Sequence, residues 1–307
     1  MAKVSVIIPT HNRSALLGEA IQSVLDQTFE DFELLVVDDG SKDNPEQVAR
    51  SFSDPRIHFV RHPVARGGGA ARNTGIGSTS GPYVAFLDDD DAWYPEKLAL
   101  QVALLDQGPA NLGLIYGGYD VTDPANDQVL RTRIPTARGN LRERFLRSNV
   151  IGGTSLILVR RSCIESVGAF DESLPSFQDY DLYLRLSEHY EFDFVAKAVS
   201  RYRRHEVQIW KNPQAVLHGM ERMLQKHGSN RRFRHYIARG HQKLGRQLCM
   251  SGDLSQGRRV LLRAIRLNPH NLHTYRDVAL SLFRPSLPRW ALRLKAVVAR
   301  RRRARTR

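Results

Sequence analysis

The chain has 307 residues, of which 41% are hydrophobic and 25% are charged, proportions that are ordinary for a globular protein with a sizeable core. The apolar run at residues 4–9 is too short for the core of a signal peptide, and no stretch approaches the ~20 apolar residues of a membrane span. The net charge of +14 is uneven, because residues 200–307 hold 27 Lys or Arg and four acids, whereas the remainder holds 19 and 28. Composition therefore predicts an acidic, enzyme-like body with a basic C-terminal third.

Strand and helix patterns alternate over the first 90 residues. Apolar or β-branched runs predict strands, at 3–9, 32–37, 57–60 and 83–87. Apolar residues at helical spacing predict helices, at 14–27, 45–52 and 67–76. Strands separated by helices of this length form βαβ units, so we expect an α/β fold with a parallel, doubly wound sheet.

The alternation loosens between about 110 and 200, where we expect the sheet to be completed and a second wall of a cleft to be built. The elements predicted there are strands at 112–119 and 156–159 and helices at 140–147 and 177–189. After Arg204 only helix patterns remain. We predict an α/β domain over 1–210, a helical region over 211–287 and a basic tail over 288–307.

The two cysteines, Cys163 and Cys249, lack the spacing of a metal site. They indicate a reducing compartment in which both thiols are buried packing residues. We therefore expect a cytoplasmic protein, either free or bound peripherally to the inner face of the plasma membrane.

Four consecutive aspartates follow the buried strand at 83–87, at the edge where open α/β sheets bind ligands. Along an extended backbone Asp88 and Asp90 share one side, and Asp89 points away. Two carboxylates on one side repel each other unless a cation compensates, and a hard divalent ion shared with substrate phosphates would do so. The alternative is a solvated acidic turn before the next helix, and Asp91 is interpreted as a cap of that helix.

Three further stretches carry candidate site residues. The Asp38-Asp39-Gly40-Ser41 turn ends the second strand, so a carboxylate there either accepts from a base or ribose or is merely part of a turn. The glycines at 67–69 precede a helix start that attracts anions, and Arg72 could clamp a phosphate there. The alternative is a tight turn with a surface arginine.

Asp179 lies in the first turn of a predicted helix, whose dipole would keep its carboxylate ionised. It is either a general base beside a bound sugar or only a helix cap. Asp181 is interpreted as a cap or as the partner of Arg185, four residues later. His205, in a basic turn, could reach a metal or a diphosphate, or it could be an exposed histidine.

Together these stretches resemble the family 2 glycosyltransferases, which are inverting enzymes with the GT-A fold, a mostly parallel, Rossmann-like sheet flanked by helices. Six matching stretches run in family order over roughly the first 205 residues. They are VSVIIPTHNR (4–13), QTFEDFELLVVDDGSKDN (27–44), ARNTGI (71–76), FLDDDDAWYPEKLALQ (86–101), VGAFDESLPSFQDYDLYLRL (167–186) and YRRH (202–205).

The resemblance implies a nucleotide-sugar pocket in which Asp38 contacts the base. Pro9, Thr10, Asn12 and Asp39 would line the same pocket.

The family's DxD motif falls on Asp88, Asp89 and Asp90. Asp90 is the favoured metal ligand for Mn²⁺ or Mg²⁺, Asp88 lies nearer the ribose and also serves the metal, and Asp89 belongs to the donor pocket. Arg72 would face the pyrophosphate and His205 would reach the metal, although the residues after His205 depart from the family pattern.

In the family a glutamate precedes the base aspartate, and here Gln178 precedes Asp179. The resemblance implies a metal-dependent transfer from a nucleotide-diphosphate sugar, with a UDP-sugar favoured, to an acceptor hydroxyl that Asp179 deprotonates. A saccharide or lipid-linked acceptor and a role in surface polysaccharide or glycolipid synthesis are expected. Because of Gln178, a catalytically impaired nucleotide-sugar-binding module is the alternative.

The positive charge of the C-terminal third raises the question of two anionic partners, nucleic acid and a membrane surface. Nucleic acid is not expected, because no recognised nucleic-acid motif accompanies the charge. The tail at 289–307 holds nine basic residues and no acid, and its apolar residues fall on one side of a helix. It either lies on an anionic membrane surface or is disordered.

Overall fold

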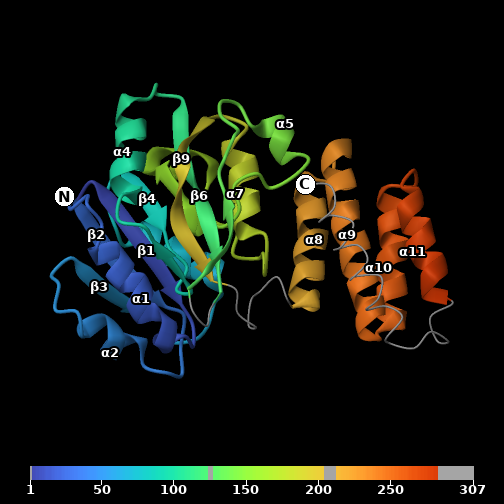
Figure 1. Cartoon of the computed structure of the whole chain (residues 1–307), viewed down its shortest axis with the longest axis horizontal. Coiled ribbons are helices and arrows are strands. Elements are labelled where there is room, and N and C mark those ends of the chain that lie inside the picture. The colour runs from blue at the N-terminus through green and yellow to red at the C-terminus, as the bar shows by residue number, and fades with distance from the viewer. Residues whose placement is uncertain (1, 124–126, 204–211, 283–307) are drawn as a thin grey trace. The chain divides into compact units, whose positions relative to one another are not determined.

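The computed structural model describes residues 2–123, 127–203 and 212–282 (Figure 1). By its contacts the chain divides into a first unit that ends at His227 and a second that begins at Gly228. The helix at 213–227 thus belongs with the first unit, whereas the sequence suggested a boundary near residue 210. His205 and the tail at 288–307 lie outside the described residues, so the expectations for them remain predictions.

The described part of the first unit is built on a nine-stranded sheet with the order β3-β2-β1-β4-β8-β6-β9-β5, and β7 pairs with β6 (Figure 1). Strands β3, β2, β1 and β4 are parallel, β8 is antiparallel to both of its neighbours, and β9 is parallel to β6. The strands are β1 (Val4–Thr10), β2 (Phe32–Asp38), β3 (Ile57–Arg61), β4 (Tyr83–Phe86), β5 (Asp91–Trp93), β6 (Leu112–Thr122), β7 (Val129–Arg133), β8 (Ile157–Arg160) and β9 (Glu191–Arg203).

Helices flank this sheet and make up all of the described C-terminal region. They are α1 (Ser14–Leu25), α2 (Pro45–Arg50), α3 (Gly68–Gly77), α4 (Lys97–Gln107), α5 (Arg142–Phe145), the 3-10 helix η1 (Thr154–Leu156), α6 (Arg161–Val167), α7 (Gln178–Leu186), α8 (Pro213–His227), α9 (Arg231–Ser251), α10 (Leu254–Leu267) and α11 (Leu272–Leu282). Each element expected between residues 3 and 90 is present within a few residues of its predicted bounds. The predicted α/β class with a helical C-terminal region is confirmed.

The core of the first unit follows from the apolar runs of the parallel strands. Every residue of β1 and β4 is buried, as expected for central strands with helices on both faces. Helix α3 packs so closely on β1 that a Cβ added at Gly75 would lie 2.4 Å from Ile7 Cγ2. This close approach packs the C-terminal half of α3 directly against the central strand β1.

A buried ion cluster joins α8 to α7. The carboxylate of Asp181 is fully buried and accepts hydrogen bonds from Arg185 Nε at 2.9 Å and Lys226 Nζ at 3.0 Å, and it lies 2.8 Å from His227 Nε2. The predicted pairing with Arg185 is confirmed, but the ions from α8 were not foreseen. Burial by itself would raise the pKa of Asp181, yet His227, Arg185 and Lys226 together lower it.

We expect Asp181→Asn to lower the free energy of unfolding by about 3 kcal/mol, because it removes the buried carboxylate that Arg185 and Lys226 share, and Lys226 keeps only Asp171 as an ion-pair partner. A group with a lowered pKa in the folded state stabilises the protein above its unfolded pKa, about 4, and loses this effect as the pH falls through the folded value. The difference between wild type and variant should therefore shrink below pH 4 in urea titrations. An equal difference at pH 7 and pH 3 would contradict this account.

The second unit contains α9, α10 and α11, with α9 and α10 connected through the turn at Gly252. Cys249 lies between these helices. Neither it nor Cys163 forms a disulfide, and both are buried, as predicted. None of the described helices combines the length and apolar character that a bilayer crossing requires.

Candidate active site

The carboxyl edge of the parallel strands gathers the acidic residues singled out in the sequence. Thr10, the last residue of β1, pairs with Asp38, the last residue of β2. On the other side of β1, the backbone of Leu87 bonds to Ile7, so the chain after β4 leaves the sheet at the same edge. The Asp38-Asp39 pair and the run at 88–91 therefore flank the end of β1.

Asp38 presents a buried acceptor oxygen. Its side chain is fully buried, and its Oδ1 accepts from the Ser41 backbone at 2.8 Å. Its Oδ2 lies 3.3 Å from Arg61 Nε, but no hydrogen bond to it forms within the described residues. An unsatisfied buried acceptor costs about 1–3 kcal/mol, so a ligand N–H would be stabilised here.

Asp39 clamps the loop that leads to α3. Its carboxylate accepts from the backbone of Arg66 at 2.8 Å and of Gly67 at 2.7 Å, and it lies 2.8 Å from His62 Nδ1. Gly40, at φ 71°, permits this approach, because a Cβ there would lie 2.7 Å from the backbone of Ala65. Burial by itself would raise the pKa of Asp39, but the hydrogen bonds from Arg66, His62 and Gly67 lower it. The structure thus shows Asp39 as a loop clamp.

Asp89 is buried, and its carboxylate faces Thr10 and Arg13. Its Oδ2 accepts from Thr10 Oγ1 at 2.8 Å, and its Oδ1 accepts from Arg13 at 3.0 Å. The same arginine nitrogen donates to Asp90 at 2.8 Å. Burial raises the pKa of Asp89 to about 6, against the opposing effect of Arg13. Arg13 therefore holds two carboxylates of the acidic run through one guanidinium nitrogen, a role that its place in the sequence did not indicate.

Asp88, Asp90 and Asp91 bring carboxylate oxygens within 4.8 Å of one another. A turn at residues 89–90 returns the chain so that the Asp91 backbone bonds to Asp88. The expectation that Asp91 caps a helix is wrong: Asp91 begins β5 and is buried, whereas α4 starts at Lys97. The sequence missed this third carboxylate because alternation along a strand does not extend through a turn.

The cluster fits a divalent cation. Asp91 Oδ2 accepts from Ser155 Oγ at 2.6 Å, but its Oδ1 is buried without a hydrogen-bond partner in the described residues. Burial, and then the charges of Asp90 and Asp88, raise the pKa of Asp91 well above its usual value. Oxygen ligands in this arrangement suit Mg²⁺ or Mn²⁺, which would relieve the repulsion. Whether His205 joins them lies outside the described residues.

Arg72 connects the acidic cluster to α7. It donates to Asp88 Oδ1 at 2.5 Å and to Gln178 Oε1 at 3.2 Å, and its guanidinium lies 5.6 Å from the ring centre of Phe170. Its Nε is buried and has no hydrogen-bond partner among the described atoms. One donor of this arginine is thus left for a ligand, and Gln178 takes the place at which the family has a glutamate.

Asp179 lies beside this arginine in the first turn of α7. Its Oδ2 accepts from Asn149 Nδ2 at 3.2 Å. Burial raises the pKa of Asp179 to about 6; the Asp88 charge also raises it, whereas the Tyr180 backbone, Arg72 and Asn149 oppose the rise. A carboxylate with a pKa near neutrality, next to the acidic cluster, suits a general base.

The remaining candidates lie on the β1 side. Pro9 is a buried residue of β1. Asn12 adopts φ 54° and accepts from the Lys42 backbone at 2.7 Å, so it ties the end of β1 to the turn after Asp38. Asn149, from a loop, and Ser155, from the short 3-10 helix η1, were missed, because the sequences around them carry no local signal for this site.

Two solved structures share this architecture. S. aureus TarS, residues 1–349 in complex with UDP-GlcNAc, aligns with a TM-score of 0.65 and 18% identity over 86% of this chain and 81% of that one. The mannosyltransferase PcManGT of Pyrobaculum calidifontis, in complex with GDP-Man and Mn²⁺, aligns with a TM-score of 0.61 and 19% identity over 97% and 80%. The fold is of the GT-A type, as the sequence predicted.

The family follows from sequence. Residues 5–167 match the model described as glycosyl transferase family 2, and the chain belongs to that family. It is 38% identical over 189 residues to an uncharacterized glycosyltransferase of Rickettsia felis, covering 60% of this chain and 31% of that protein. It is 40% identical over 118 residues to Escherichia coli WfgD, a UDP-Glc:alpha-D-GlcNAc-diphosphoundecaprenol beta-1,3-glucosyltransferase, covering 38% and 46%. The chain spans less than half the length of either relative.

Proposed function

We propose that the chain transfers a sugar from a nucleotide-diphosphate sugar to an acceptor hydroxyl, with inversion at the anomeric carbon. One observation carries this proposal: Arg72 joins the carboxylates after β4 to the start of α7, where Asp179 lies. The residues proposed to bind the donor diphosphate and the residue proposed as the catalytic base therefore lie at the same edge of the sheet. A nucleotide base would extend toward the Oδ2 of Asp38, which accepts no hydrogen bond from the described residues.

In the proposed reaction the donor diphosphate lies between Arg72 and the acidic cluster. Asp179 takes the proton of the acceptor hydroxyl, whose oxygen attacks the anomeric carbon as the bond to the diphosphate breaks. The nucleoside diphosphate leaves with that electron pair, and the Nε of Arg72 donates to it. Asp88, Asp90 and Asp91 would hold a divalent cation, which supplies positive charge for the leaving group.

The proposed acceptor is a saccharide or a lipid-linked saccharide. Support comes from WfgD, whose name gives a diphosphoundecaprenol-linked acceptor, and from WcaA of Escherichia coli, a putative colanic acid biosynthesis glycosyl transferase that is 30% identical over 61% of this chain. We propose that the protein serves surface polysaccharide or glycolipid synthesis on the cytoplasmic side of a membrane. A UDP-sugar is the favoured donor.

A donor screen tests the proposal. UDP-, GDP- and dTDP-sugars are titrated with Mn²⁺, by calorimetry for binding and by release of nucleoside diphosphate for turnover. We expect one nucleotide class to bind and turn over, and Asp38→Ala to weaken its binding about tenfold by removing an acceptor for the base. The control Asp106→Ala alters a half-exposed carboxylate that pairs with Lys3. Binding without turnover on any acceptor would instead indicate a nucleotide-sugar-binding module.

A further inference from the structure

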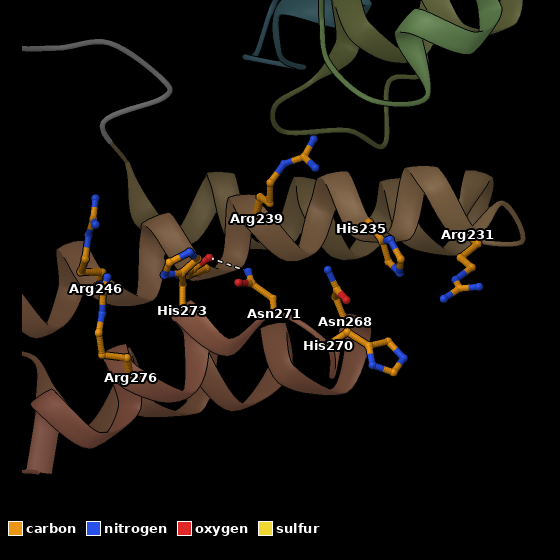
Figure 2. Close-up of a pocket in the computed structure, with 10 residues that line it drawn as sticks. Arg231, His235, Arg239, Arg246, Asn268, His270, Asn271, His273 and Arg276 are labelled. Carbon is orange, nitrogen blue, oxygen red and sulfur yellow. Dashed lines mark hydrogen bonds between the residues drawn. The ribbon is translucent and has the colours of Figure 1, made fainter.

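The second unit contains a polar groove of about 750 Å³, lined from α9 and from the segment at 268–276 (Figure 2). Arg231 and Arg246, at its two ends, are fifteen residues apart on α9, which is about 22 Å of helix. These cations are too widely spaced to surround one small anionic ligand, so the groove does not define a binding site.

The turn before α7, in the first unit, contains a strained residue. Phe177 has φ 65° and ψ 19°, in the left-handed region, which a bulky side chain adopts only at a cost in free energy. Its carbonyl accepts from the Asp181 backbone at 2.9 Å, which is the first hydrogen bond of a helix that begins at Gln178. The direction in which α7 leaves the turn therefore depends on the conformation of Phe177.

The two residues that follow Phe177 belong to the candidate active site. Gln178 accepts a hydrogen bond from Arg72 at 3.2 Å, and Asp179 accepts one from Asn149 at 3.2 Å. The turn thus fixes where the proposed base lies relative to the arginine that bonds to the acidic cluster.

Helix α8 packs against this turn at a buried glycine. A Cβ added at Gly219 would overlap Ser176 Oγ, and it would lie 2.9 Å from Phe177 Cδ2 and 3.0 Å from the Ser176 carbonyl oxygen. Ser176 Oγ also donates to the carbonyl of Ala215, one turn earlier on α8, at 3.0 Å. A glycine at position 219 therefore allows α8 to contact the backbone of the turn directly.

A salt bridge attaches α8 to the chain before the turn as well. Lys226 Nζ donates to Asp171 at 3.0 Å, and Lys226 follows Gly219 by seven residues, so both lie on one face of α8. Neither this pair nor the Ser176 bond involves Asp181. A strained conformation persists only where its surroundings hold it in several ways, and this face of α8 supplies those contacts.

We propose that Gly219 and Ser176 are positioning residues: through them α8 imposes the left-handed conformation of Phe177, and this conformation sets the place of Asp179 in the active site. The inference rests on the proposed function, since it gives α8 a part in the transfer reaction. The effect is exerted through the backbone of α7 and not through contact with the donor. The proposed active site thus depends on a helix that lies beyond residues 5–167, the part that matches the family model.

Two substitutions of Phe177 separate its conformation from its ring. Asparagine and valine both remove the ring, but asparagine adopts a positive φ far more readily than the β-branched valine. Phe177→Val should therefore lower kcat for transfer by about 10–10²-fold relative to Phe177→Asn, since misplacing a reacting group by about 1 Å can cost about 10²-fold. Donor affinity, measured by calorimetry, should be the same in both variants, because Asp38 and the acidic cluster lie on other elements.

Gly219→Ala tests the same contact from the side of α8. The added methyl group forces α8 and the turn apart, so kcat should fall by a similar factor while donor affinity is retained. The matched control is Gly18→Ala on α1, where the added Cβ meets, among the described residues, only Val48 Cγ1 at 3.7 Å, and kcat should remain that of wild type. Because alanine favours a helix over glycine at both positions, helix propensity does not account for the difference.

Titration of the Asp179 carboxyl group gives a readout that does not require transfer. Its carbon NMR signal in the full chain is assigned by its absence from Asp179→Asn. In Phe177→Asn the pKa should stay at about 6, where burial and the Asp88 charge raise it against the opposing effects of Arg72 and Asn149. In Phe177→Val the pKa should fall toward about 4, because the carboxylate moves out of its buried position.

Equal kcat and equal titration of Asp179 in the two Phe177 variants would overturn the proposal, as would a Gly219→Ala protein with the kcat of Gly18→Ala. If Phe177→Val does not unfold cooperatively in urea, the two glycine variants decide the question. If the wild type transfers no sugar from any donor while the Asp179 titration still differs between the Phe177 variants, the proposed function fails and the positioning by α8 stands.

Discussion

Replacing Asp179 by asparagine is expected to lower kcat for transfer by about 10²–10⁴-fold while leaving donor affinity unchanged. The asparagine keeps the shape of the side chain but has no lone pair basic enough to take the acceptor proton. Asp179 accepts from Asn149 and lies near Arg72, whose contacts to Asp88 and Gln178 do not involve it. Donor titration and initial rates of transfer, measured on the same preparation, separate the two effects.

The pH profile gives this prediction a second readout. With a pKa of about 6, Asp179 is ionised above that pH and protonated below it. Transfer at pH 5 should therefore fall to about a tenth of its plateau. The residual activity of Asp179→Asn should lose this dependence. Asp89 also titrates near pH 6, but it lies between Thr10 and Arg13 and takes no proton from the acceptor.

Asp181→Asn is the matched control, because it makes the same change two residues along α7 on a side chain that binds α8. We expect it to reduce stability but to retain kcat per folded molecule. If Asp179→Asn kept most of the transfer rate, or if both variants lost it equally, the assignment of Asp179 as the base would fail.

Replacing Asp90 by alanine is expected to weaken donor binding at least about tenfold and to lower kcat by about 10²–10³-fold. Asp90 is one of three carboxylates whose oxygens lie within 4.8 Å, so its loss removes a cation ligand. It also leaves Arg13, which bridges Asp89 and Asp90, with one carboxylate fewer. Donor affinity and turnover are measured with Mn²⁺ and after chelation.

Chelation should reduce wild-type turnover to near the level of Asp90→Ala and have little further effect on the variant. Asp106→Ala, a carboxylate on α4 that pairs with Lys3, is the control and should respond to chelation as wild type does. Full turnover of the chelated wild type would contradict the proposed cation, and the charge of the acidic cluster would then be balanced by Arg13 and Arg72 alone.

The spacing of apolar residues predicted the N-terminal half of the sheet and its helices, whose conformation depends on nearby sequence. The buried runs of β1 and β4 and the helices between them follow from apolar spacing, and their parallel pairing follows from connection length. Strand β9 was missed. Its thirteen residues are unevenly buried, and its pairing with β6 shifts register at three places, so no regular alternation marks it in the sequence.

The candidate active site likewise contains residues that the local sequence indicated and residues that it did not. Asp88 and Asp90 do present carboxylate oxygens to one another, as predicted, but the turn at 89–90 brings them together, so the strand alternation used for the prediction is not the reason. Asp91 joins them only through a turn. Arg13 and Ser155 reach the acidic run across 76 and 64 residues of sequence, respectively, and such distant contacts are set by the packed fold. No periodic pattern could have indicated them.

The clamp formed by Asp39 has a consequence for the energetics of donor recognition. The loop before α3 is fixed by three contacts to one carboxylate, and the imidazole of His62 extends this network to Thr74 Oγ1 on α3 at 2.8 Å. In the proposed reaction a donor bound beside this loop would contact a segment that is already ordered, so little of its interaction energy would be lost to ordering the chain. Substitutions at Asp39 should thus appear in calorimetry as a larger entropic penalty for donor association, with the contacts to the nucleotide themselves unchanged.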